Sequence, residues 1–169
     1  FLVERVPLLP DGAGRPGPGR IFSFWMGGYA VALPVVYGSW ILTESLLGKP
    51  PISDNPLIPL LFESGSATDR FGMLLFVAVL APVFEELLFR GIVLPSLRHR
   101  LGAAPAIFLS GLLFGAIHLD PSALLPLTCL GCVLGYVAHR GGSLVPAILL
   151  HSLWNAQSFV QLELLRRLA

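Results

Sequence analysis

Charged residues divide this chain into long runs that carry no formal charge. The main runs cover residues 21–43, 71–84, 101–119, 121–138 and 141–162. The longest holds 23 residues, and an α-helix needs about 20 apolar residues to cross the hydrocarbon core of a bilayer. The pattern therefore predicts a membrane protein.

The composition supports the same class. Hydrophobic residues make up 54% of the chain and charged residues 12%, with a mean hydropathy of +0.77, whereas a soluble domain carries roughly 25% charged residues. The apolar content excludes a disordered chain, and two cysteines cannot form a disulfide framework. A net charge of +1 without a basic cluster longer than two residues argues against a nucleic-acid partner.

The runs predict an all-α, polytopic transmembrane helical bundle with spanning helices at 21–43, 71–97, 101–119, 121–138 and 141–162. The expected organisation is a flexible Pro/Gly-rich segment over 1–20, a first transmembrane helix plus an interfacial loop over 21–70, a core over 71–162 and a short tail over 163–169. The chain begins with Phe1 rather than Met, so we expect it to be part of a longer protein.

The basic residues predict an orientation in the membrane. If the five spans alternate, one side of the membrane receives Arg15, Arg20, Arg98, Arg100 and Arg140. The positive-inside rule makes that side cytoplasmic. Arg166 and Arg167 fall on the other side, against the rule.

Three charged residues interrupt the predicted 71–97 helix. A carboxylate or arginine at mid-bilayer costs at least about 2.5–3.5 kcal/mol on insertion scales. Glu86 and Arg90 are four residues apart and share a helix face, so they are expected to pair. Glu85 points about 100° away from Glu86. A buried ion pair that holds helices together would explain Glu86 but leaves Glu85 without a structural reason.

Two further helices carry isolated polar residues. Phe114 and His118 are four residues apart on one predicted helix, and His151 and Asn155 are four apart on another. Either histidine alone would most simply be a satisfied core residue. Since polar groups in lipid must face protein or water, we expect His118, His151, Asn155 and Glu85 to meet in an active-site cavity inside the membrane, with Glu85 directed at His118.

Such a cluster supports two kinds of chemistry. A glutamate beside an imidazole can deprotonate water, and an imidazole with a carboxamide can donate hydrogen bonds to an oxyanion. The same Glu85, His118 and His151 could equally be three ligands of an open zinc site with water in the fourth position.

The motifs Glu85-Glu86-x-x-x-Arg90, Phe114-x-x-x-His118 and His151-x-x-x-Asn155, in this order, closely resemble the signature motifs of the CPBP family. These are the CAAX-type and bacteriocin-processing intramembrane proteases, also called the Abi family. The resemblance implies an intramembrane endopeptidase, multi-pass in the plasma membrane or an internal membrane, that acts on a peptide or protein, either prenylated or a leader peptide.

The resemblance also implies roles for the site residues. Glu85 would be the water-activating base with His118, His151 with Asn155 would form the oxyanion side, and Glu86 with Arg90 would be the supporting pair. Family members have been described both as zinc metalloproteases and as metal-independent glutamate proteases. Zinc is therefore the candidate cofactor of the alternative mechanism.

Two other functions compete with the protease. A non-catalytic membrane scaffold could share the fold, although the intact polar residues argue against it. A transporter or proton relay could also use intramembrane Glu and His. A transporter would be expected to show repeated halves or matching broken helices, and the sequence shows neither.

Overall fold

The computed structural model describes residues 16–48 and 66–168, and these two ranges contain helices and no strand. The elements are α1 (Pro18–Leu47), α3 (Ala67–Leu75), α4 (Ala81–Leu88), α5 (Leu94–Leu101), α6 (Ala103–Ala116), α7 (Leu124–Gly141) and α8 (Val145–Leu168). The predicted all-α bundle is confirmed. The expectations for residues 1–15, and for most of the loop at 49–65, lie outside the described residues.

The prediction of five spanning helices is only partly met. By length and composition, three helical stretches of the described chain can cross a membrane: α1, the continuous helix from Ala67 to Leu101, and α7. The helix α6 is apolar but has 14 residues, about 21 Å at 1.5 Å per residue, which is shorter than the hydrocarbon core. The helix α8 is 24 residues long, but it carries several polar side chains: His151, Asn155, Gln157 and Gln161.

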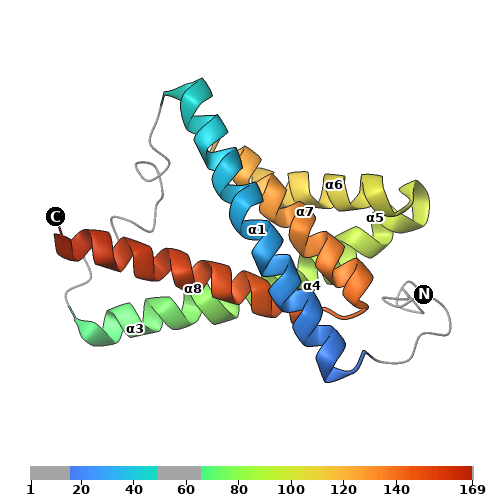
Figure 1. The fold of residues 1–169 in the computed structure, drawn as a ribbon, viewed down its shortest axis with the longest axis horizontal. Helices are drawn as coiled ribbons and strands as arrows, with labels where there is room; N and C mark the ends of the chain where they lie inside the picture. Colours follow the sequence, from blue (N-terminus) through green and yellow to red (C-terminus); the bar gives the residue numbers. More distant parts are fainter. Residues whose placement is uncertain (1–15, 49–65, 169) are drawn as a thin grey trace.

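The core of the bundle forms where α1, α7 and α8 meet. Figure 1 shows α1 crossing α8 and lying along α7. The buried apolar residues at this junction come from all three helices: Ala32, Val36, Leu130, Leu134, Val137, Ala147, Leu150 and Trp154. Since helices in lipid gain little from the hydrophobic effect, this contact depends on close van der Waals packing.

The pair α6 and α7 packs even more closely, through glycines. A Cβ atom placed on Gly131 would lie 2.7 Å from the Cα of Gly111, and one placed on Gly111 would lie 2.8 Å from the Sγ of Cys132. Small residues of this kind allow helix backbones to approach in membranes. The contact brings the α7 backbone close to α6, at the point where the carbonyl of Gly131 accepts a hydrogen bond from Arg90.

Two π-turns divide the long helix of residues 67–101, and each one ends two residues before a proline. The first covers Phe76–Leu80 and is followed by Pro82 in α4, and the second covers Phe89–Val93 and is followed by Pro95 in α5. Proline has no backbone N–H, so one helical hydrogen bond cannot form at each position. The π-turns bracket the segment that carries Glu85 and Glu86, in keeping with the frequent occurrence of π-turns at functional sites.

The glycine contact generates a prediction about stability. Replacing Gly131 with Ala forces the two backbones apart, and we expect the free energy of unfolding to fall by about 1–3 kcal/mol. The matched control is Gly27→Ala in α1, where an added Cβ meets nothing within 4 Å. This control is expected to leave stability unchanged or raised by up to about 1 kcal/mol. Reversible unfolding in mixed micelles, followed by circular dichroism, measures both, and equal stability of the two variants would contradict the close contact.

Candidate active site

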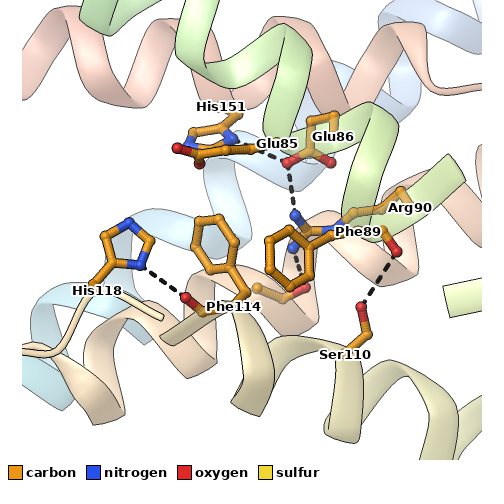
Figure 2. Close-up of polar contacts among 9 residues, drawn as sticks. Glu85, Glu86, Phe89, Arg90, Ser110, Phe114, His118 and His151 are labelled. Atoms are coloured by element: carbon orange, nitrogen blue, oxygen red, sulfur yellow. Dashed lines mark hydrogen bonds and ion pairs between the residues drawn. The ribbon is translucent and has the colours of Figure 1, made fainter. Parts of the chain in front are cut away.

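The carboxylate of Glu86 lies at the centre of a buried polar cluster (Figure 2). Its Oε1 accepts a hydrogen bond of 2.7 Å from Nη1 of Arg90 and one of 2.9 Å from Nδ1 of His151. The exposed fractions of these residues are 0% for Glu86, 1% for Arg90 and 2% for His151. The predicted Glu86–Arg90 pair is confirmed, and His151 joins it from α8.

Arg90 also contacts two neighbouring helices, α6 and α7. Its Nη2 donates a hydrogen bond of 2.8 Å to the backbone carbonyl of Gly131 in α7. Its guanidinium also lies over the ring of Phe114 in α6, 4.9 Å from the ring centroid. A cation over an aromatic face is stabilised more strongly when it is desolvated. Arg90 therefore ties α6 and α7 to the helix that carries the glutamates.

The hydrogen bond to Glu86 fixes the orientation of the His151 ring. A carboxylate can only accept here, so Nδ1 of His151 carries a hydrogen. The other ring nitrogen, Nε2, then faces Oε2 of Glu85 at 3.6 Å. The Glu85 side chain is 27% exposed, so the two neighbouring glutamates occupy different environments. As predicted, no hydrogen bond or ion pair joins Glu85 to Arg90 in the described chain.

His118 occupies a different position from the one expected. The helix α6 ends at Ala116 rather than near 119, and His118 lies in the turn that follows. Leu119 has a φ of +55°, a left-handed conformation that a helix cannot contain. Nδ1 of His118 bonds to the carbonyl of Phe114 at 2.8 Å, and no hydrogen bond or ion pair joins His118 to Glu85 among the described residues.

Phe114 nevertheless brings the two histidines into one region. Its ring centroid lies 5.0 Å from that of His118 and 5.5 Å from that of His151, both edge to face. Figure 2 shows the three rings and the Glu85 carboxylate in the same part of the site. The motif that paired Phe114 with His118 thus identified a ring that also contacts Arg90.

Asn155 makes its contact at the first π-turn. Ala81 donates its N–H to Phe76, and Pro82 has no N–H to offer, so the carbonyl of Val77 lacks a partner within its own helix. Nδ2 of Asn155 donates to that carbonyl at 2.9 Å. Neighbouring helices commonly satisfy backbone groups freed by proline in membranes. Sequence reasoning missed this contact, although a proline inside an apolar helix signals that some donor is needed.

The predicted zinc ligands fit a metal only in part. Three ligands about 2.0–2.2 Å from one ion lie roughly 3–3.5 Å from each other. The 3.6 Å between Glu85 and His151 is close to that range, but His118 does not complete the set. Within the described ranges, no three His, Cys, Asp or Glu side chains gather closely enough to hold a metal ion.

The fold and this site define a class of protein: an all-α membrane protein with a buried Glu–Arg–His cluster and a second, partly exposed glutamate. Comparison with known families gives the narrower assignment. The family model described as type II CAAX prenyl endopeptidase Rce1-like matches residues 67–157, which contain every motif residue discussed above. The chain belongs to this Rce1-like family of membrane proteases, and it is a multi-pass membrane protein.

A curated relative is also similar over most of the chain. It is an uncharacterized 24.3 kDa protein of Escherichia coli, 35% identical over 160 residues, which cover 89% of this chain and 69% of the relative. No solved structure matches the chain significantly.

The buried Glu86–Arg90 pair generates a second prediction. Replacing Arg90 with Met leaves the Glu86 carboxylate buried without its cation, and we expect a loss of about 3–5 kcal/mol in the free energy of unfolding. Adding Glu86→Gln to Arg90→Met removes the stranded charge and is expected to restore part of that loss. Unfolding in mixed micelles compares the single and double variants. A double variant less stable than the single one would contradict this account.

The contact between Asn155 and Val77 generates a third prediction. Asn155→Ala leaves the Val77 carbonyl without a donor, at a cost of about 1–3 kcal/mol. Pro82→Ala supplies a backbone N–H at the same turn, so its effect on stability is expected to be more favourable in the Asn155→Ala background than in the wild type. A double-mutant cycle from unfolding measurements gives this coupling, and strictly additive effects would argue against the shared carbonyl.

Proposed function

We propose that this protein is an intramembrane endopeptidase in which Glu85 activates a water molecule for attack on a peptide carbonyl. Family membership supports the reaction class. The observation that carries the residue assignment is the difference between the two glutamates. Glu86 is fully buried and bonded to Arg90 and His151, whereas Glu85 is part-exposed and, among the residues that the structure describes, has only His151 within ion-pair distance.

Glu85 is suited to be the general base. A base must reach the proton it removes and must be accessible to the water that carries it. Its Oε2 lies 3.6 Å from Nε2 of His151, a separation at which one water molecule can contact both groups. Glu85 would accept the water proton as the oxygen attacks, and would later return it to the leaving amine.

His118 and His151 would assist on either side of Glu85. We assign His118 to the water with Glu85, because its Nε2 is left available when Nδ1 bonds to Phe114, and a movement of the turn at Leu119 would bring it closer. We assign His151 to the developing oxyanion. Because Nδ1 of His151 already donates to Glu86, this role needs a second proton on Nε2. That proton would also balance the two carboxylates and one guanidinium of the cluster, and it leaves Glu85 ionised to act as the base.

Asn155 completes the proposed oxyanion side. One hydrogen of its amide is used on the Val77 carbonyl, and an amide carries a second. A hydrogen bond from that second N–H, together with one from His151, would stabilise the tetrahedral intermediate. Glu86 and Arg90 do not reach the substrate in this proposal; they position His151.

For the substrate, we propose a prenylated peptide of the CAAX type, on the strength of the family description. A leader peptide is the alternative. The polar cluster lies within helices whose outer faces are apolar, with exposed side chains such as Phe84, Leu87 and Leu88 on α4. A substrate that carries its own lipid chain is suited to reach such a site through the bilayer.

The role of Glu85 generates a fourth prediction. Glu85→Gln is expected to leave stability nearly unchanged, because Glu85 is not part of the buried pair, and to lower kcat by about 10²–10⁴-fold. Cleavage of a farnesylated CAAX peptide by the purified protein in proteoliposomes measures this, beside the same peptide without the lipid and a leader peptide. The contrast variant is Glu86→Gln, which should lose stability as well as activity.

The outcomes separate the competing roles. A stable and fully active Glu85→Gln protein would overturn the assignment of the base. A well-folded wild type that cleaves none of the three peptides would favour the scaffold.

The proposal and the zinc alternative differ in their response to chelation. In our scheme, activity survives thorough treatment with a zinc chelator, because the water is activated by side chains alone. Bound zinc at unit stoichiometry that is lost in His151→Ala, together with chelator-sensitive cleavage, would replace our scheme with a metal site built on Glu85, His118 and His151.

A further inference from the structure

Four arginines and two histidines of the described chain lie at one end of the bundle, where the first turn of α1 meets the last turns of α5 and α7, and the other arginines lie elsewhere. We call this the basic end, and its residues are Arg20, Arg98, His99, Arg100, His139 and Arg140. Two hydrogen bonds join the three helices there. Nη2 of Arg20 donates to the carbonyl of Arg140 at 2.8 Å, and Nη1 of Arg98 donates to Nδ1 of His139 at 3.0 Å.

Two of the acidic residues outside the polar cluster, Glu44 and Asp120, lie away from the basic end. Because α1 and α7 run antiparallel, the end of α1 with Glu44 and the turn with Asp120 before α7 lie away from the basic end. No carboxylate of residues 16–48 and 66–168 forms an ion pair with Arg20, Arg100 or Arg140. These three side chains are exposed.

Helix dipoles explain only part of this arrangement. Cations are favourable in the last turn of a helix, as in α5 and α7, but unfavourable in the first turn, where Arg20 lies in α1. Arg20 donates a hydrogen bond to the carbonyl of Arg140 at the end of α7, and the N–H of Gly142 donates to the carbonyl of Ala138. Two carbonyl oxygens that would repel an anion are thereby occupied, and the Arg20 side chain, which uses Nη2 for this bond, remains exposed.

We propose that the basic end is a binding site for the phosphate of an anionic phospholipid, with Arg20 and Arg140 as its principal ligands. Arginine binds phosphate oxygens with paired N–H donors. The site lies at helix ends, where a spanning protein meets the headgroups. An anionic lipid at this position would also hold the basic end at the cytoplasmic leaflet, in agreement with the positive-inside expectation. This inference is independent of the proposed proteolysis.

The test uses the full chain purified in detergent and titrated with an equimolar mixture of phosphatidylglycerol and phosphatidylcholine, with bound lipid counted by native mass spectrometry. We expect phosphatidylglycerol to be preferred. Each arginine near a charged lipid surface adds to the free energy of lipid binding. Removing both, in Arg20→Gln/Arg140→Gln, should therefore weaken phosphatidylglycerol binding by about 30-fold. The matched control, Arg20→Lys/Arg140→Lys, keeps the charges but loses the paired donors, so its preference for phosphatidylglycerol should lie between those of the wild type and the Gln variant.

Each result decides the proposal. If the double Gln variant fails to fold, Arg140→Gln alone carries the test, because the contact of residue 140 with Arg20 is made by its backbone carbonyl, and it should lose about fivefold. Equal binding of both lipids by the wild type, or an unchanged preference in the folded Gln variants, would overturn the site. Inorganic phosphate that binds alone as tightly as the lipid would show a free-anion site and overturn the lipid assignment.

Discussion

The arrangement of the site depends on one carboxylate oxygen that two helices share. Oε1 of Glu86 accepts from Arg90 on its own helix and from His151 on α8, while Arg90 also donates to the backbone of Gly131 on α7. A buried ion pair is often no more stable than an apolar core, so its value here lies in fixing positions. With Glu86 ionised, the tautomer of His151 and the approach of α7 are both determined.

Proline imposes the second constraint. In lipid every backbone carbonyl must find a donor inside the protein, and Pro82 and Pro95 each remove one. The π-turns lie on either side of the two glutamates, where these donors are missing, and the Asn155 side chain supplies a replacement donor at the first of them. The helix α8 therefore contacts the helix of the glutamates at two points. Asn155 bonds to Val77, before the glutamates in the chain, and His151 bonds to Glu86 itself.

The sequence predicted what local spacing controls. Glu86 and Arg90 pair because residues four apart lie on the same face of a helix. Glu85 points in another direction because neighbouring residues on a helix differ by about 100°. The partner of His151 could not be foreseen, because Glu86 is 65 residues away along the chain and its choice depends on the tilt of α8. The position of His118 was missed because Leu119 leaves the helix for the left-handed region, which no apolar pattern reveals.

Two adjacent glutamates can differ so much because a helix turns about 100° between them. This difference in direction places Glu86 between Arg90 and His151, where removing its charge would disturb the packing. It places Glu85 beside Nε2 of the same histidine. His151 thus has a structural nitrogen and an available one, and the first orients the second. A single carboxylate could not do both, since an oxygen that holds the helices together is not accessible to take a proton from water.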